Sequence, residues 1–184
     1  MLVKSSEKPE RLALAYDAIV AAPFTHLTNA GDATMVDVGA KNESRRRAVA
    51  SACVRTTRPV LEAVLTGAAP KGDVLAAARI AGILAAKRTA ELIPLCHPVR
   101  TTRASVDFEA DAKHEELRIR ATIEAVDRTG VEMEAMVAVS VASLTVYDMI
   151  KSADRWATIA MLRLDSKSGG KSGDVTRPPE RGAS

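Results

Sequence analysis

Acidic and basic side chains within residues 132–151 have the types and spacing that acid–base chemistry requires. Asp148 and Lys151 stand three positions apart, so on a helix they share one face. Glu134 lies 14 positions before Asp148, within about 40° of that face at roughly 100° per residue. The residues between them are mostly apolar, and a charge on a buried apolar face is costly unless it is paired or used. This favours Asp148 as a general acid–base candidate. The alternatives are a plain Asp148–Lys151 ion pair, and Glu132 and Glu134 serving the helix dipole.

Lys71 and His97 are candidate ligand-binding groups outside that stretch. Lys71 comes just before an expected helix start, where a cation beside free backbone N–H groups suits a phosphate. His97 follows Cys96 in a loop bracketed by prolines, so it could bind a ligand or simply pack in a turn. The only other cysteine is Cys53, and no second pair has zinc-ligand spacing. We therefore expect no metal site.

The segment Lys167-Ser-Gly-Gly-Lys-Ser-Gly-Asp174 resembles half of a phosphate-binding P-loop. A complete motif needs a glycine five residues before Gly170, where Asp165 stands, and two prolines at 178–179 forbid the following helix. A nucleotide triphosphatase loop is therefore excluded. A Gly-rich segment with Lys167 and Lys171 can still surround a phosphate group, and the alternative is a disordered basic tail.

The charge of the chain is unevenly distributed. Lys and Arg total 26 against 23 Asp and Glu, for a net charge of +3, yet residues 41–58 alone carry +5. That segment is either a solvated face or an anion site.

Composition excludes several classes of protein. With 47% hydrophobic residues, the 184-residue chain is not intrinsically disordered, and it has no run of about 18 uncharged apolar residues that could span a membrane. Two cysteines cannot form a disulfide framework and favour a reducing compartment, the cytoplasm. Aromatic residues make up only 3% while alanine occurs 33 times, so the core is built from small side chains and association with other subunits is expected.

The elements that must position these groups follow from periodicity and capping. Pro59 begins a short helix that Gly67 ends, while Asp73 and Thr129 are expected to cap the two longer helices. The pattern predicts strands over 47–57, 104–109, 116–125 and 158–165, and helices over 59–65, 74–91 and 130–153. Apart from one extra helix, this order is βαββαβ. We therefore predict an α+β, ferredoxin-like fold with an antiparallel four-stranded sheet packed by helices.

Three segments are expected along the chain. Residues 1–24 form an N-terminal extension, predicted as a short helix or loose segment rather than a signal peptide, because Asp17 interrupts the apolar run and no cleavage motif follows. Residues 25–174 form a single catalytic α+β domain whose first part, 25–47, is a lead-in loop. Residues 175–184 form a C-terminal tail.

Seven motifs in this order resemble the cyclic pyranopterin monophosphate synthase family, the molybdenum cofactor biosynthesis protein C family. The resemblance covers about residues 25–174. The motifs are Met35-Val-Asp-Val38, Lys71-Gly-Asp73 with Ala78-Arg-Ile-Ala-Gly82, Lys87-Arg-Thr89, Leu92-Ile-Pro-Leu-Cys-His-Pro98, Thr129-Gly-Val-Glu-Met-Glu-Ala135, Tyr147-Asp-Met149 with Lys151, and Lys167-Ser-Gly-Gly-Lys-Ser-Gly173.

The resemblance implies a ferredoxin-like subunit in a homohexamer, a trimer of dimers, with active sites at subunit interfaces. It implies conversion of 3′,8-cyclo-7,8-dihydroguanosine 5′-triphosphate to cyclic pyranopterin monophosphate with release of pyrophosphate. Such a lyase needs no resident cofactor, and Mg²⁺ would enter only with the substrate triphosphate. Neither nucleic acid nor membrane is an expected partner.

The resemblance also implies roles for individual residues. Asp148 occupies the family's catalytic aspartate position, with Lys151 as its proton-transfer or charge-stabilising partner and Lys71 as a second catalytic lysine. We expect Asp148 and Lys151 to form a desolvated pair whose pKa values move toward neutrality. The positions that match the family's substrate-binding segments are Leu95, Cys96, His97, Glu132, Met133, Glu134, Lys167 and Lys171.

Two other functions are alternatives to this one. A non-catalytic phosphate-binding module would keep the pocket and lose turnover, which an activity assay distinguishes. An RNA-binding ferredoxin-like domain needs aromatic stacking residues on its strands, and the expected strands offer only Phe108.

Overall fold

A computed structural model describes residues 32–171 and 173–179 of the chain. Residues 38–184 form one compact unit, and the described part of the other unit, 1–37, is Asp32–Asp37. The predicted extension over residues 1–24 lies outside the described residues.

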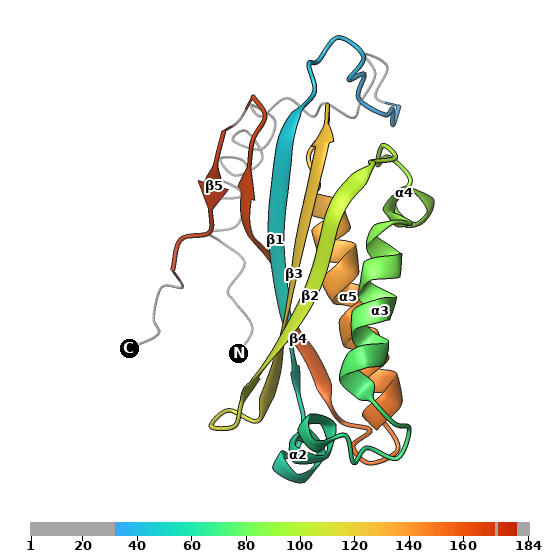
Figure 1. The fold of residues 1–184 in the computed structure, drawn as a ribbon, viewed down its shortest axis with the longest axis vertical. Coiled ribbons are helices and arrows are strands. Elements are labelled where there is room, and N and C mark those ends of the chain that lie inside the picture. The colour runs from blue at the N-terminus through green and yellow to red at the C-terminus, as the bar shows by residue number, and fades with distance from the viewer. Residues whose placement is uncertain (1–31, 172, 180–184) are drawn as a thin grey trace, which may run out of the picture. The chain divides into compact units, whose positions relative to one another are not determined.

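A single antiparallel sheet forms one layer of the larger unit (Figure 1). Its strand order is β2-β3-β1-β4-β5, so β1 lies between β3 and β4 and pairs antiparallel with both. The first four strands have the ferredoxin-like arrangement that the sequence predicts, and the short β5 extends the sheet beyond β4. The bounds are β1 Ser44–Arg55, β2 Thr101–Asp111, β3 Glu116–Asp127, β4 Thr158–Ser168 and β5 Val175–Thr176.

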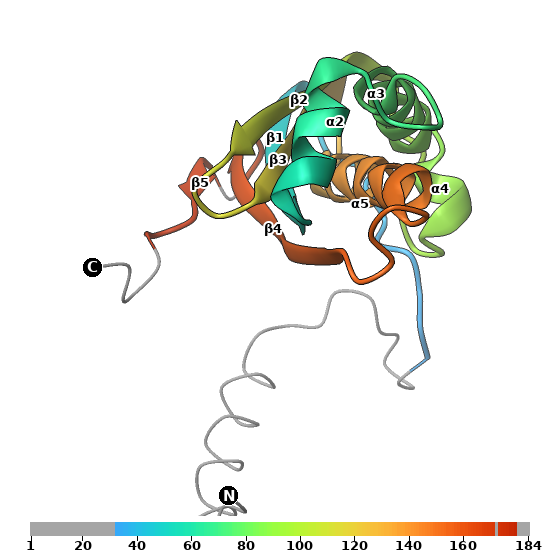
Figure 2. The same cartoon turned by 90° about the horizontal axis from the view of Figure 1, so that it is seen from below.

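The helices form the second layer, with α3 and α5 side by side on one face of the sheet (Figure 2). Asp73 caps α3 as predicted, because its carboxylate accepts a hydrogen bond from the backbone N–H of Ala76. Gly67 ends α2 in a left-handed conformation, also as predicted. The bounds are α2 Arg58–Thr66, α3 Val74–Ala86, α4 Thr89–Leu92 and α5 Glu132–Ile150.

The predicted bounds of the two longer helices are wrong. The expected helix over 74–91 is divided into α3 and α4, and at the junction the Thr89 hydroxyl donates to the carbonyl oxygen of Ala86, as mid-helix threonines do when they compete with the backbone. The helix expected over 130–153 begins at Glu132 and ends at Ile150. Its N-cap is Val131, which offers no side-chain hydrogen bond, so Thr129 is not the cap.

The lead-in loop prediction is wrong for residues 44–47, which already belong to β1. Ser44 lies opposite Asp127 in the register with β3, so the pairing continues to the end of that strand. The arginines at 45–47 are thus held on a strand rather than in a loop. This makes their directions regular, because alternate side chains of a strand face opposite sides of the sheet.

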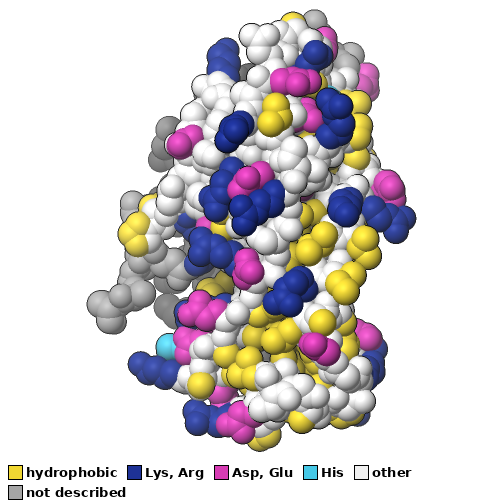
Figure 3. Space-filling model, viewed as in Figure 1, with side chains coloured by type: hydrophobic (Ala, Val, Ile, Leu, Met, Phe, Trp, Pro, Cys, Tyr) yellow, Lys and Arg dark blue, Asp and Glu magenta, His cyan; other side chains and the backbone are white. Residues whose placement is uncertain are grey.

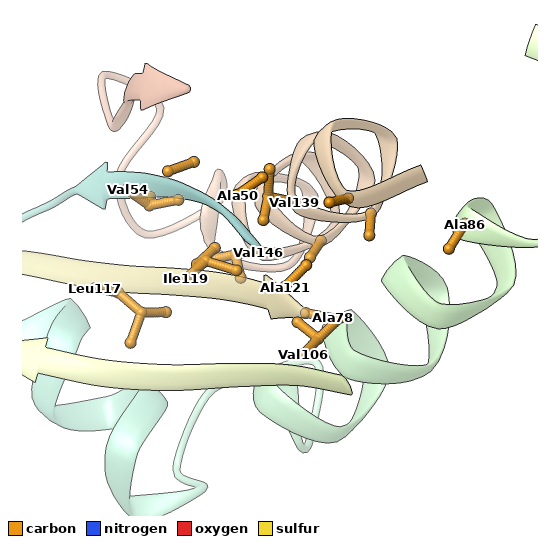
Figure 4. Close-up of a cluster of buried hydrophobic side chains, with 14 of the residues drawn as sticks. Ala50, Val54, Ala78, Ala86, Val106, Leu117, Ile119, Ala121, Val139 and Val146 are labelled. Atoms are coloured by element: carbon orange, nitrogen blue, oxygen red, sulfur yellow. The ribbon is translucent and has the colours of Figure 1, made fainter. Parts of the chain in front are cut away.

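Small side chains bring the two layers close together. Figure 4 shows Ile119 of β3 beside Val146 of α5, and Val106 of β2 beside Ala78 of α3, between the layers. A Cβ atom on Gly82 of α3 would lie only 2.9 Å from the carbonyl oxygen of Ala138 in α5. The alanine-rich faces therefore allow the close helix–helix approach that the composition suggests.

Helix α5 has the length and apolar composition of a membrane span, with a mean hydropathy of 1.4 over its most apolar window. Half of that window is buried inside the fold. Ala135, Ala138 and Ala142 are fully buried against the sheet and α3. We therefore interpret α5 as the central core helix of this unit.

Candidate active site

Asp148 lies at the centre of a three-residue charged cluster at the C-terminal end of α5. Its Oδ1 atom accepts a hydrogen bond of 2.6 Å from Lys151 Nζ, one turn further along. Its Oδ2 atom lies 3.3 Å from Lys71 Nζ, which also donates to the Asp148 carbonyl oxygen at 2.8 Å. Lys71 comes from the turn before α3, so the fold unites residues that are 77 positions apart.

The expected desolvation of this cluster is not found in the single chain. The Asp148 side chain is 57% exposed. Hydrogen bonds from Lys151 and Lys71 lower its pKa below the usual value, and the Asp148 carboxylate in turn raises the pKa of Lys151. The prediction that both pKa values move toward neutrality is therefore wrong for the isolated chain, because water and close opposite charges both favour ionised groups.

Glu134, at the other end of α5, has the opposite environment. Its residue surface is 3% exposed. Burial raises its pKa to about 7, and the charges of Glu132 and Asp127 act in the same direction, while a hydrogen bond from its own backbone N–H opposes them. A carboxyl group with such a pKa can be either proton donor or acceptor near neutral pH.

A small pocket of about 150 Å³ adjoins Glu134. Lys87 and Thr89, from the junction between α3 and α4, line it together with Pro98. Lys87 and Thr89 belong to one of the motifs that resemble the family, but the sequence alone indicates no role for them. Only the break between α3 and α4 could have indicated their position, and the uniformly helical composition of residues 74–91 hides that break.

The predicted substrate-binding loop lies near this pocket. Leu95, Cys96 and His97 are all half-buried, and the backbone N–H of Cys96 closes a turn onto the carbonyl oxygen of Ile93. Burial raises the pKa of the Cys96 thiol, and the Glu134 charge raises it further, so Cys96 and Glu134 interact electrostatically. Met133, on the first turn of α5, is exposed.

The Gly-rich segment is an ordered hairpin over its described residues, so the disordered-tail alternative is wrong there. β4 and β5 pair through Lys167 and Val175, and the N–H of Gly169 donates to the carboxylate of Asp174 at 3.0 Å. Gly170 adopts φ +82°, and a Cβ atom there would collide with the guanidinium of Arg46. The glycines thus permit a tight turn against β1.

The hairpin brings one predicted lysine to the Glu134 end of α5. Lys167 Nζ lies 3.1 Å from Glu132 Oε1, and both side chains are largely covered. Lys171 is exposed at the tip of the hairpin.

Apart from Lys171, the predicted site residues therefore form two groups at opposite ends of one helix. Glu134 and Asp148 are separated by 14 residues of α5, about 21 Å at 1.5 Å per residue. Lys71 and Lys151 belong to the Asp148 group. Leu95, Cys96, His97, Glu132, Met133 and Lys167 gather around the Glu134 end. A single chain does not bring all of them around one small molecule.

Among the described residues, no group of three or more His, Cys, Asp or Glu side chains is arranged to hold a metal ion. Both cysteines, Cys53 and Cys96, are free thiols.

Comparison with known proteins bears on these two groups. A model of the MoaC family matches residues 35–170, which contain Lys71, both ends of α5 and Lys167. A protein of Roseiflexus sp. (strain RS-1) named cyclic pyranopterin monophosphate synthase is 55% identical over 151 residues, which cover 82% of this chain and 96% of that protein. Proteins of the same name from Brucella ovis and Clostridium perfringens are 52% and 50% identical over 151 residues, or 82% of this chain and 92% and 96% of their own lengths. With a family match over most of the chain and relatives of this identity, the chain belongs to the MoaC family.

Proposed function

We propose that this chain is a cyclic pyranopterin monophosphate synthase, a lyase of molybdenum cofactor biosynthesis. It converts 3′,8-cyclo-7,8-dihydroguanosine 5′-triphosphate to cyclic pyranopterin monophosphate and pyrophosphate. The observation that carries the proposal is the contact of Asp148 with both Lys71 and Lys151, which joins a potential base to two cations. The names of its relatives support the same activity.

Asp148 and Lys151 act as the acid–base pair in this proposal. A carboxylate that accepts from two ammonium groups is a weak base while water surrounds it. Exclusion of water disfavours both charged forms, so substrate binding or subunit contact moves the two pKa values toward each other and eases proton transfer. Lys71 and Lys151 then also stabilise the negative charge that develops when pyrophosphate leaves.

The active site is shared between subunits of a homohexamer, a trimer of dimers. The 21 Å between the ends of α5 supports this, because a partner chain can bring its Glu134 group to the Asp148 group of its neighbour. Apolar side chains also lie exposed on the outer sides of the helices, among them Ile80, Leu84 and Leu144. Hydrophobic side chains gather where Figure 1 places α3 (Figure 3).

We further propose that Mg²⁺ accompanies the substrate triphosphate rather than occupying a resident site. Its chemistry there is to neutralise phosphate charge, in addition to the lysines. The cytoplasm is the proposed location, which agrees with the free thiols of Cys53 and Cys96.

The direct test incubates the purified full-length chain with the cyclic dihydroguanosine triphosphate and measures pyrophosphate and the pterin product. We expect both products in equal amounts, and their loss in Lys151→Ala. Lys113→Ala, which removes an exposed lysine from the turn between β2 and β3, is the matched control and retains turnover. A folded chain that binds the substrate without releasing pyrophosphate would instead be a binding module.

Complementation tests the shared site. Asp148→Asn and Glu134→Gln chains are each inactive alone, but co-expressed mixed assemblies regain part of the activity, because some interfaces then contain one intact group from each chain. Mixed assemblies without any recovered activity would show that both groups must come from the same chain.

A further inference from the structure

Arg45 and Arg47, at the start of β1, lie outside the two groups of the proposed active site. Residues 41–58 carry a net charge of +5, and three of their arginines are consecutive, Arg45, Arg46 and Arg47. On the sheet surface, Lys and Arg side chains gather around acidic ones (Figure 3).

These arginines line a hollow of about 470 Å³ at one end of the sheet. The walls come from three strands and from the end of β4. The polar residues that line it are Arg45, Arg46, Arg47, Thr102, Glu124 and Ser168, and two small apolar residues of β3 complete it.

The hollow carries more positive than negative charge. Glu124 Oε1 lies 3.6 Å from Nε of Arg47 and 3.9 Å from a terminal guanidinium nitrogen of Arg103, so one carboxylate pairs with two cations. The side chain of Arg46, between Arg45 and Arg47 on β1, belongs to the opposite face of the strand, where it donates to the backbone carbonyl oxygens of Asp127 and Arg128. Among the described residues no acidic side chain pairs with Arg45. The polar walls thus attract an anion.

The lining also indicates which anion. No aromatic side chain is present on which a base could stack, and the apolar contribution is limited to Ala125 and Val126. Guanidinium groups bind phosphate oxygens in a two-pronged fashion, and the hydroxyls of Thr102 and Ser168 offer further donors. Such walls bind phosphate groups and give no preference for a nucleoside.

We propose that this hollow is a separate binding site for a phosphate oxyanion of the pyrophosphate class, held by Arg45 and Arg47. The choice of pyrophosphate rests on the proposed function, which releases it. The binding itself requires no turnover, so its failure and the failure of the enzymatic assignment are distinguishable.

The test is titration calorimetry with inorganic pyrophosphate on full-length chain carrying Lys71→Ala and Lys151→Ala, which removes two cations of the proposed active site. We expect one pyrophosphate per chain to remain bound. Adding Arg45→Ala and Arg47→Ala weakens that binding at least tenfold. Adding Arg120→Ala instead, an exposed arginine of β3 that lines a different hollow on the sheet, changes it less than twofold.

Three results would overturn the proposal: no pyrophosphate binding, binding unaffected by loss of Arg45 and Arg47, or equal loss with Arg120→Ala. Inorganic tripolyphosphate and GTP form a second comparison, since both carry three phosphates and only GTP carries a base. Equal affinities support a site for phosphate groups alone, and tenfold tighter GTP binding contradicts it. Turnover lost in Lys71→Ala while pyrophosphate binding persists separates this site from the catalytic one.

Discussion

The two ends of α5 carry carboxyl groups in opposite environments. Asp148 is more than half exposed and touches two ammonium groups, which lower its pKa. Glu134 is almost fully buried, with acidic Glu132 and Asp127 as neighbours, and its pKa rises to about 7. Along a single helix, surroundings rather than residue type therefore decide which carboxyl exchanges a proton near neutral pH.

Substitution of Asp148 is expected to have the largest effect on turnover, because it removes the exposed carboxyl group of α5. Asp148→Asn keeps the shape but loses the negative charge, and turnover falls about 10²- to 10⁴-fold, the usual contribution of a general acid–base group. The thermal unfolding midpoint stays unchanged because the side chain is exposed. Asp107→Asn, an exposed aspartate of β2, is the control and retains full turnover. Near-normal turnover in folded Asp148→Asn would exclude Asp148 from proton transfer.

The pH dependence of the free energy of unfolding tests the buried carboxyl group, Glu134. Burial raises the pKa of Glu134 from 4.5 to about 7, so between these values the folded chain binds more protons than the unfolded chain. The contribution of protonated Glu134 to the free energy of unfolding is complete below pH 4.5, falls as the pH rises, and is lost above pH 7. At roughly 1.4 kcal/mol per pH unit this amounts to about 3 kcal/mol.

Glu134→Gln removes this dependence, because glutamine does not titrate. Urea unfolding at pH 5 and pH 8 measures the difference in free energy of unfolding for both chains. An equal pH dependence in wild type and Glu134→Gln would show that Glu134 is ionised in the folded protein.

Substitution of Gly82 in α3, which packs against α5 between its two ends, is expected to have a smaller effect on stability. In Gly82→Ala the new Cβ atom meets the backbone oxygen of Ala138 and the side chains of Val106 and Ala142, so α3 and α5 must separate slightly. We expect a loss of about 1–3 kcal/mol in the free energy of unfolding, typical of overpacking.

A second glycine provides the comparison for Gly82. A Cβ atom on Gly67 would meet nothing within 4 Å, so Gly67→Ala loses stability only through its left-handed backbone, φ +71°. The Gly82 substitution should shift the methyl NMR signals of Val106 and Ala142, and the Gly67 substitution should not. Matching spectra for both variants would contradict tight packing at Gly82.

The smallest effect concerns the thiol of Cys96. Burial and the charge of Glu134 both raise its pKa, so alkylation by iodoacetamide is slow near neutral pH. In Glu134→Gln the second contribution disappears, and the pH profile of alkylation moves to lower pH. A profile that does not move would show that Cys96 and Glu134 do not interact.

The fold was largely predictable because its signals are local. β3 alternates cleanly, Asp73 caps α3, and Gly67 ends α2. The break at Thr89 and the start of α5 at Glu132 were missed, since they depend on side-chain bonds and packing rather than on periodicity.

The candidate site was predictable as a set of residues but not as a geometry. Spacing along α5 indicated that Glu134 and Asp148 share a face, yet Glu134 is buried and Asp148 is exposed. Burial depends on what packs over each end, and the sequence of one element does not contain that information. The contact of Lys71 with Asp148 spans 77 positions and likewise arises only from the tertiary fold.

The close contact at Gly82 has a mechanical consequence for the proposed assembly. Because α3 packs tightly against the middle of α5, we expect α5 to move as a rigid helix, so a displacement of one end also displaces the other. When each active site combines Asp148 of one subunit with Glu134 of the next, every α5 connects two neighbouring sites. In that arrangement we expect ligand binding at one site to shift the carboxyl group of the adjacent site, and therefore cooperativity between subunits.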